Sequence, residues 1–165
     1  MLATGAQEPT LTTSDVAQAA GLVVRSTHGR ILLAEPTTKP RWDVVGGVVE
    51  VGESVVEAAR REALEEVGVP LEVGDLLVVD ACRATTEREA ITCFLLDGGV
   101  HEESLTDTFT YPDGELVRAH WVAPGAVLDR CGPRIGRRLT AVLEALRTGR
   151  LPGPPLRLVD GAPER

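Results

Sequence analysis

Residues 46–69 read GGVVEVGESVVEAARREALEEVGV and carry the strongest structural signals in the chain. Ser54 and Glu57 form an S-x-x-E capping box, and Gly68 supplies a C-terminal stop, so a helix is predicted over residues 54–67. Apolar residues recur along one narrow side of this helix, at positions 56, 59, 63 and 67, which suits packing against a sheet. The glycine pair at 46–47 interrupts an apolar, strand-like run. The stretch therefore predicts a strand, a loop and a capped helix.

Three glutamates of the predicted helix project from one of its sides. Glu62, Glu65 and Glu66 stand at i, i+3 and i+4, and like charges at this spacing repel one another. Hard carboxylate oxygens suit Mg²⁺, with Mn²⁺ as a substitute, and such a cation would remove the repulsion. Gly47 lets the backbone come close, and its carbonyl could face the cluster. The other interpretation is a solvated acidic face, partly balanced by Arg61.

The same stretch resembles a known motif. The segment from Gly47 to Val69 fits the Nudix box, G-x5-E-x7-R-E-U-x-E-E-x-G-U, where U is a bulky aliphatic residue and Ala63 is smaller than usual. The chain is thus similar to the Nudix hydrolases over roughly residues 18–147. This resemblance implies an α/β fold, namely an α/β/α sandwich with a mixed central sheet. It also implies Mg²⁺-dependent attack of water on the diphosphate of a nucleoside diphosphate linked to another moiety. The fixed box positions are Gly47, Glu53, Arg61, Glu62, Glu65, Glu66 and Gly68.

The resemblance also implies roles for individual residues. Glu62, Glu65 and Glu66 are expected to bind the metal and take part in catalysis, and the Gly47 carbonyl to join them, although a β-bulge alone would also explain this glycine. Glu53 is either a base or metal ligand, or it orients Arg61 through a salt bridge.

A further acid lies outside the box. The resemblance makes Glu115 an additional candidate metal ligand, and a solvated loop residue is the alternative. It follows the turn-forming pair Asp113-Gly114.

The segment before the box contains candidate substrate contacts. Lys39 and Arg41 lie among prolines and threonines and are candidate phosphate contacts. Trp42 is a candidate for stacking on a base, and a place in the core is the alternative. Residues 83–87, where some Nudix subgroups carry a substrate signature, carry none. A nucleotide, a nucleotide sugar and a nucleoside triphosphate all stay open as substrates.

The rest of the chain predicts one domain. Strand-like runs at 20–24 and 31–33 flank a turn, runs at 76–81 and 90–96 form a second pair, and 120–122 is a further strand. Residues 134–147 have the period of an amphipathic helix. Polar residues 1–16 and Pro/Gly-rich residues 149–165 are predicted to be tails, which leaves the domain at 17–148.

The composition excludes some classes of binding partner. The chain has 165 residues and a formal net charge of −8, which argues against binding nucleic acid or an anionic membrane. The three cysteines lack CxxC pairing and the start of the chain lacks a signal-peptide pattern, so reduced thiols in the cytoplasm are expected. A small-molecule nucleoside diphosphate derivative is the expected partner, and a homodimer stays open.

Two other functions share the fold. One is a catalytically silent nucleotide-binding sensor, and the other is an isoprenoid-diphosphate isomerase-like enzyme that relies on a reactive cysteine. The chain has no cysteine in a motif that supports the second.

Overall fold

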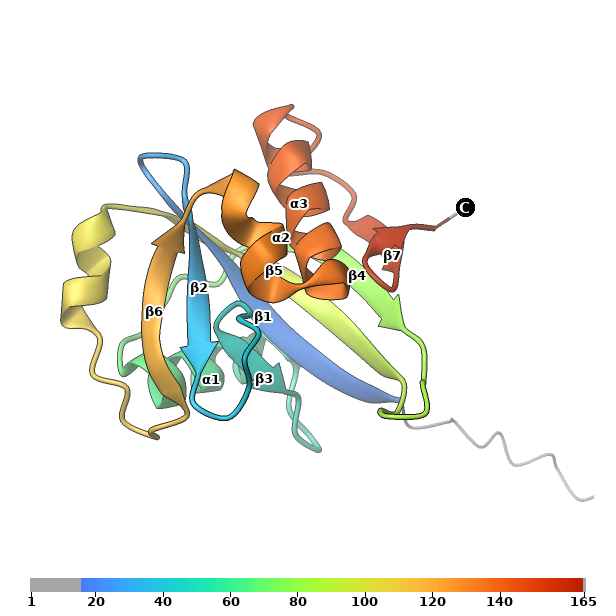
Figure 1. Cartoon of the computed structure of the whole chain (residues 1–165), viewed down its shortest axis with the longest axis horizontal. Coiled ribbons are helices and arrows are strands. Elements are labelled where there is room, and N and C mark those ends of the chain that lie inside the picture. The colour runs from blue at the N-terminus through green and yellow to red at the C-terminus, as the bar shows by residue number, and fades with distance from the viewer. Residues whose placement is uncertain (1–15, 165) are drawn as a thin grey trace, which may run out of the picture.

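A mixed eight-stranded sheet forms the centre of the structure, a computed structural model that describes residues 16–164 (Figure 1). The strands lie in the order β6-β2-β1-β5-β4-β7-β8, and the short β3 pairs with β1. β1 runs parallel to β5 but antiparallel to β2 and β3. The strands are β1 (Ala17–Ser26), β2 (Ile31–Pro36), β3 (Gly46–Val48), β4 (Leu76–Cys82), β5 (Ile91–His101), β6 (Leu116–Val122), β7 (Leu156–Val159) and β8 (Ala162–Pro163).

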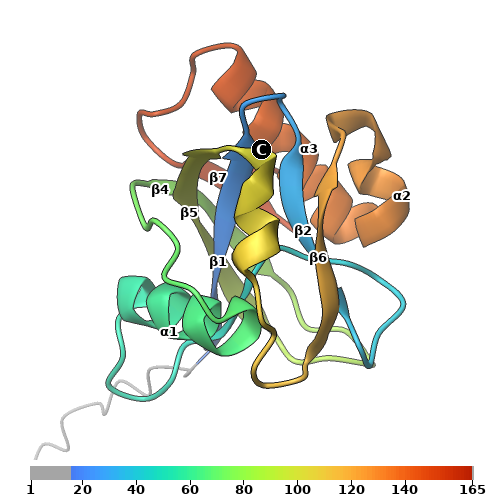
Figure 2. The ribbon, with the colours of Figure 1, turned by 90° about the vertical axis from the view of Figure 1, so that its left-hand side faces the viewer.

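Helices cover both faces of this sheet (Figure 2). On one face, α1 (Val55–Val67) packs against the strands through Ala58, Ala59, Ala63 and Val67, which are fully buried. Small side chains let the helix lie close to the sheet. On the other face lie α2 (Val127–Cys131) and α3 (Pro133–Arg147). The prediction of an α/β/α sandwich with a mixed central sheet is confirmed.

The predicted strands reappear with longer bounds, and the predicted helices agree with the structure to within one residue at each end. The first two runs pair as β1 and β2, the second two as β4 and β5, and both predicted helices form. Three short helices carried no periodic signal, because each is shorter than two α-helical turns. They are η1 (Glu103–Thr108), η2 (Pro124–Ala126) and α2.

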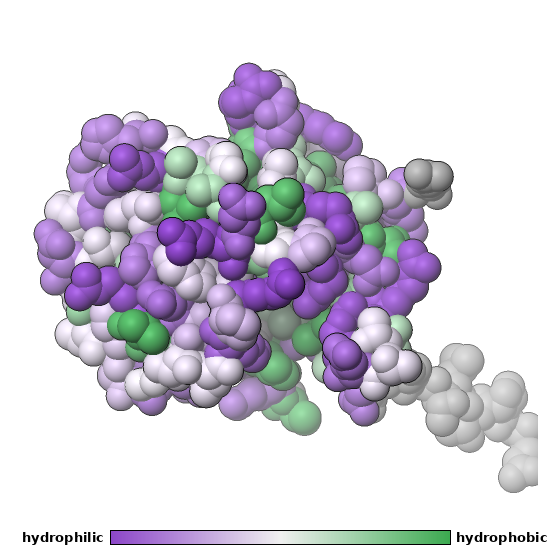
Figure 3. Space-filling model, viewed as in Figure 1, coloured by the Kyte–Doolittle hydropathy of each residue, from purple (hydrophilic) through white to green (hydrophobic). Residues whose placement is uncertain are grey.

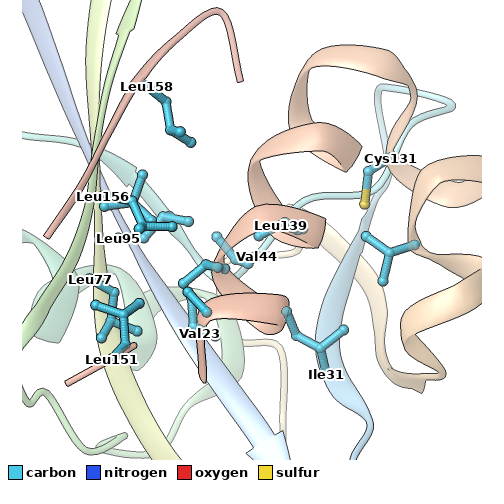
Figure 4. Packing of buried hydrophobic residues seen from close by; sticks show 14 of the residues in the cluster. Val23, Ile31, Val44, Leu77, Leu95, Cys131, Leu139, Leu151, Leu156 and Leu158 are labelled. Carbon is cyan, nitrogen blue, oxygen red and sulfur yellow. The ribbon is translucent and has the colours of Figure 1, made fainter. Parts of the chain in front are cut away.

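The C-terminal segment corrects one prediction. Residues 149–165 were expected to form a tail, but β7 pairs in parallel with β4 and extends the sheet. Leu151, Leu156 and Leu158 are buried between the sheet and α3 (Figure 4). The Pro/Gly-rich composition favours a tail, but leucines that alternate with exposed residues favour a strand. Burying each leucine stabilises the fold, and the strand forms. The domain therefore continues through β8. The predicted N-terminal tail falls on residues 1–15, outside the described residues, apart from Val16.

The surface is mostly polar. In Figure 3 the face with α2 and α3 is largely hydrophilic, with apolar residues in separate small groups. Among residues 16–164, no helix has the length and apolar composition required to cross a bilayer.

Candidate active site

Residues at both ends of α1 fix the limits of this helix. At the start of α1, the Ser54 hydroxyl accepts a hydrogen bond from the Glu57 amide, and the Glu57 carboxylate accepts one from the Ser54 amide, at 3.2 and 2.8 Å. Gly68 ends the helix in the left-handed conformation, with φ of 77°. The predicted capping box and C-terminal stop are both present, and they determine where the helix begins and ends.

Gly47 lies directly against a glutamate of α1. A Cβ atom at position 47 would be 2.3 Å from the Glu62 Oε1 atom, so only glycine lets β3 pass this carboxylate so closely. β3 is held there by antiparallel pairing with β1, where Gly47 faces Ala20. The predicted approach of the Gly47 backbone to the carboxylate cluster is thus present.

Arg61 joins the loop to the helix. Its guanidinium donates two hydrogen bonds to the Glu53 carboxylate, at 2.8 and 3.0 Å, and one to the Val48 carbonyl at 2.9 Å. Nη1 donates further to Glu62 and Glu65, at 2.9 and 3.0 Å. The second Glu53 oxygen also accepts the Glu50 amide. Both Glu53 oxygens therefore accept hydrogen bonds. This geometry fits the alternative in which Glu53 orients Arg61 through a salt bridge.

Glu66 is a buried acid. Only 7% of its surface is exposed, and its Oε2 accepts the Gly46 amide at 2.9 Å. Burial raises the pKa of Glu66 to about 8, against the Gly46 hydrogen bond, and the negative charges of Glu62, Asp113 and Glu115 raise it further. The site therefore disfavours the ionised carboxylate in the absence of a cation.

The other two glutamates of the cluster differ in environment. Burial raises the pKa of Glu62, with opposition from Arg61 and support from Glu65 and Glu115. The Glu65 side chain is 50% exposed and lies at the outer side of the cluster. Within residues 16–164, no group of three or more His, Cys, Asp or Glu side chains is arranged to hold a metal ion as it stands. Here Arg61 Nη1 bridges Glu62 and Glu65, so a cation shared by these two requires that contact to open.

The residues nevertheless fit a hard divalent cation. A carboxylate that is buried but favours its neutral form gains most from a nearby positive charge, and no ion pair to Glu66 exists among the described residues. The Gly47 backbone lies against the Glu62 carboxylate, and Glu66 lies on the same helix, so oxygen donors are available at this point. Oxygen donors of this kind suit Mg²⁺ and Mn²⁺.

A loop before β6 brings further acids to the cluster. The Asp113 amide donates to the Glu65 carbonyl at 3.2 Å, which docks this loop on the last turn of α1. Glu115 is exposed and lies near enough to raise the pKa of Glu62 and Glu66. The sequence identified Glu115 as a candidate but treated Asp113 only as part of a turn, because nothing in the pattern indicated that the loop contacts α1.

A cleft of about 930 Å³ opens beside the acids. On the side formed by β3 and α1 it is lined by Gly47, Glu62 and Glu66, with Glu115 nearby. The loop before β3 contributes Lys39 and Arg41, both exposed, as a phosphate-binding role requires. Glu53 and Glu65 do not line this cleft.

The opposite side of the cleft contains residues that sequence reasoning missed. Cys93 of β5 and Arg134 and Arg138 of α3 line it, together with Asp43. Burial raises the pKa of Asp43, against the charges of Arg138 and Arg134 and the Val44 amide. These residues lie far apart in the chain and match no motif, so only the packing of α3 on the sheet brings them together.

Trp42 does not occupy the predicted position. Its ring stacks on His120 with centroids 4.5 Å apart, and the Arg130 guanidinium lies 4.6 Å from the ring centroid. It does not line the cleft. The indole thus packs on protein groups and does not face the cleft, so the structure does not place it where the predicted stacking on a base would occur. The residues around Trp42 in the sequence do not indicate that it would contact His120 and Arg130.

The sequence model of the family described as NUDIX domain matches residues 16–143. The chain belongs to the Nudix family. A MutT-like protein of Streptomyces ambofaciens is 30% identical over 144 residues, which cover 86% of this chain and 82% of the relative. Among solved structures, a C. elegans Ap4A hydrolase is 21% identical with a TM-score of 0.63, covering 81% of this chain and 99% of that one. A UDP-X diphosphatase is 20% identical with a TM-score of 0.68, covering 92% and 70%.

As a Nudix hydrolase, the chain is an enzyme of the class that acts on phosphoric anhydrides. Its Nudix box is the Gly47–Val69 segment, which forms β3, the Arg61-clamped loop and α1. The cleft residues Asp43, Cys93, Arg134 and Arg138 all lie outside this box.

Proposed function

We propose that this protein is a Mg²⁺-dependent pyrophosphohydrolase that cleaves the diphosphate of a nucleoside diphosphate linked to another moiety. The observation that carries the proposal is Glu66, a buried carboxylate without an ion-pair partner among the described residues, at the wall of a cleft of nucleotide size. A bound cation explains such a buried, unpaired carboxylate better than a solvated acidic surface does. The solvated-face interpretation of the acidic helix fits Glu65 but not Glu66.

Glu62, Glu65, Glu66 and the Gly47 carbonyl would hold the cation, with Glu115 as a further ligand from the loop before β6. Mn²⁺ is a chemically similar substitute. The bound ion supplies neutralisation of the phosphate charge and polarisation of the reacting oxygens.

The chain's own residues position the reaction. Arg61 and Glu53 hold the loop against α1, so Glu53 is a positioning residue in this proposal. Lys39 and Arg41 contact the phosphates from the rim of the cleft. A water oxygen bonds to one phosphorus, the bond from that phosphorus to the bridging oxygen breaks, and the second phosphate leaves with the electron pair. A glutamate of the cluster accepts the proton of the water.

The substrate class follows from the cleft and the relatives. Ap4A hydrolase and UDP-X diphosphatase are named for substrates in which phosphoric anhydride bonds link a nucleoside to another group. The cleft volume accommodates a molecule of this size. We therefore expect a nucleotide sugar, a dinucleoside polyphosphate or a nucleoside triphosphate as substrate.

A product assay tests the proposal. UDP-glucose, ADP-ribose, Ap4A, dGTP and 8-oxo-dGTP are incubated with the protein in Mg²⁺ and in EDTA, and nucleotide products are separated by chromatography. We expect Mg²⁺-dependent release of a nucleoside monophosphate from at least one compound. Reaction in ¹⁸O-labelled water should place the label in one product.

Two variants define the site in this assay. Glu66→Gln should lose activity by about 100-fold or more, since it removes one charge of the cluster. Glu144→Gln is the matched control, because Glu144 pairs with Arg147 on exposed α3 and should leave turnover unchanged. Nucleotide binding without turnover of any compound would instead support the sensor function.

A further inference from the structure

Two cysteines that are 11 residues apart in the sequence meet on neighbouring strands. Cys82 ends β4 and Cys93 lies near the start of β5, and their sulfur atoms are 3.9 Å apart. In the antiparallel register Cys93 faces Asp80, which is two residues from Cys82, so both thiols lie on the same face of the sheet. This is the face covered by α3, which supplies the residues around the pair.

Two guanidinium groups converge on one of these sulfur atoms. Arg134 Nη1 and Arg138 Nη2 each donate a hydrogen bond to the Cys82 sulfur, at 3.1 Å. Arg138 also donates to the Asp80 carboxylate, and both of these side chains are almost fully buried. The two arginines thus contact the Asp80 carboxylate and the Cys82 sulfur directly. The Asp43 carboxyl also interacts with both arginines, but burial raises its pKa. A Cys82 thiolate therefore supplies negative charge to this group.

The two thiols have different chemical character. A hydrogen bond with Cys93 lowers the pKa of Cys82, and the charge of Arg138 and the Arg134 hydrogen bond lower it further, against burial and Asp80. The same hydrogen bond, together with burial, raises the pKa of Cys93. One sulfur is therefore prepared to act as a nucleophile, while its neighbour keeps its proton.

We propose that Cys82 and Cys93 form a peroxide-reactive dithiol beside the substrate cleft, in which Cys82 is the attacking thiolate and Cys93 the resolving thiol. The oxidant is hydrogen peroxide, and the product is an intramolecular disulfide. None of the Nudix box residues takes part, so this property is independent of the hydrolytic function.

The reaction balances in two steps. The Cys82 thiolate attacks one peroxide oxygen, the O–O bond breaks, and sulfenic acid forms with release of hydroxide. The Cys93 thiol then attacks the Cys82 sulfur, an S–S bond forms, and the sulfenic oxygen leaves as water with the Cys93 proton. The hydroxide takes up the proton that Cys82 lost on ionisation. Two thiols are oxidised by two electrons while one peroxide is reduced to two waters.

Access and geometry permit these steps. Cys93 lines the cleft and is 9% exposed, whereas Cys82 is 2% exposed and does not line it. A small peroxide therefore has to pass Cys93 to reach the Cys82 sulfur. Bond formation requires the sulfurs to approach from 3.9 Å to about 2.05 Å. Cys82 is the last residue of β4 and precedes a loop, so this end of the strand can adjust without disturbing its centre.

Oxidation should change one side of the cleft. The disulfide removes the thiolate that Arg134 and Arg138 bind, and both arginines line the cleft. Arg134 is only half-buried and has no other hydrogen-bond partner among the described side chains, so it becomes free to turn toward a ligand.

Peptide mapping tests the proposal on the full chain. The protein is treated with a small excess of hydrogen peroxide, blocked with N-ethylmaleimide and digested with trypsin. Cleavage at arginine places Cys82, Cys93 and Cys131 in three separate peptides, 62–83, 89–118 and 131–134. We expect peptides 62–83 and 89–118 to appear cross-linked, about 2 Da lighter than the two free thiol peptides together, and to separate on reduction.

Cys131 is the internal control. It is buried in α2, no hydrogen-bond donor reaches its sulfur among the described residues, and burial raises its pKa to about 12. It should stay reduced while the pair reacts. Equal oxidation of Cys131, or Cys82 oxidised to sulfinic acid without a cross-link, would contradict the assigned roles.

Matched variants test the arginine contacts. Arg134→Gln should slow oxidation of Cys82 about tenfold, because it removes one of the two donors that stabilise the thiolate. Arg137→Gln changes the neighbouring exposed arginine, whose one side-chain hydrogen bond within residues 16–164 is to the Asp160 carbonyl, and should leave the rate unchanged. Cys93→Ser should allow sulfenic acid at Cys82 but no disulfide, which a dimedone-type probe detects. Equal oxidation rates in both arginine variants would overturn the proposal.

Discussion

Glu66→Gln should stabilise the metal-free protein at alkaline pH. The ordinary glutamate pKa of 4.5 rises to about 8 in the folded state, chiefly because Glu66 is buried. At about 1.4 kcal/mol for each tenfold change in proton affinity, ionising Glu66 costs the folded state up to about 5 kcal/mol. Glutamine keeps the shape and the acceptor for the Gly46 amide but carries no charge.

The sign of the pH dependence follows from the direction of the pKa change. The folded state binds the Glu66 proton more tightly than the unfolded state does. Proton binding at Glu66 therefore stabilises the folded wild type fully below about pH 4.5, and this contribution is lost as the pH rises toward 8. The variant should therefore match the wild type near pH 5 and exceed it by about 2–5 kcal/mol near pH 9, the lower values reflecting local relaxation around the charge.

Urea denaturation in EDTA, at intervals between pH 5 and 9, measures this difference. Glu65→Gln is the matched control, since it removes a charge one position earlier, where the side chain is 50% exposed. It should change the pH dependence far less, through its effect on Glu62 alone. Saturating Mg²⁺ near pH 9 should stabilise the wild type by about 3 kcal/mol at a hundredfold excess over Kd, and the variant less. Parallel stability curves for wild type and Glu66→Gln in EDTA would refute the buried-charge reasoning.

Three further changes test other parts of the structure. Arg61→Gln removes the paired hydrogen bonds to Glu53 and should lower kcat/KM about 100-fold through misplacement of the loop, measured with the substrate found in the product assay. Retention of full activity would show that the clamp is dispensable. Leu158→Ala should lower the free energy of unfolding by about 2–4 kcal/mol in urea titration, whereas a detached tail predicts no change. Trp42→Leu should lower the melting temperature but leave KM within about twofold, because His120 and Arg130 already engage the indole. A tenfold rise in KM would restore Trp42 as a substrate contact.

Local signals predicted the part of the site that is contiguous in the chain. Ser54, Glu57 and Gly68 fix the helix through hydrogen bonds within a few residues, so the capping pattern is sufficient to place it. The Glu62, Glu65 and Glu66 spacing likewise determines that three carboxylates share one side of α1. The pattern could not tell which of them is buried, because that depends on how closely β3 and the loop before β6 approach the helix.

Other errors arose where contacts join distant segments. Leu156 and Leu158 lie in a Pro/Gly-rich segment that resembles a tail, and only pairing with β4 gives them a core to enter. Trp42 was interpreted from its neighbours in sequence, while its actual partners, His120 and Arg130, come from β6 and α2.

The amino-acid pattern was sufficient to predict the box, its helix and the chemical class of its donors, since these rest on spacing along a few turns of one element. The burial of Glu66, and the meeting of Cys82 and Cys93 with Arg134 and Arg138 beside the cleft, became visible only in the three-dimensional structure. The physical reason is that burial and charge pairing depend on distances between strands and helices that the mixed sheet sets, and no local pattern encodes those distances.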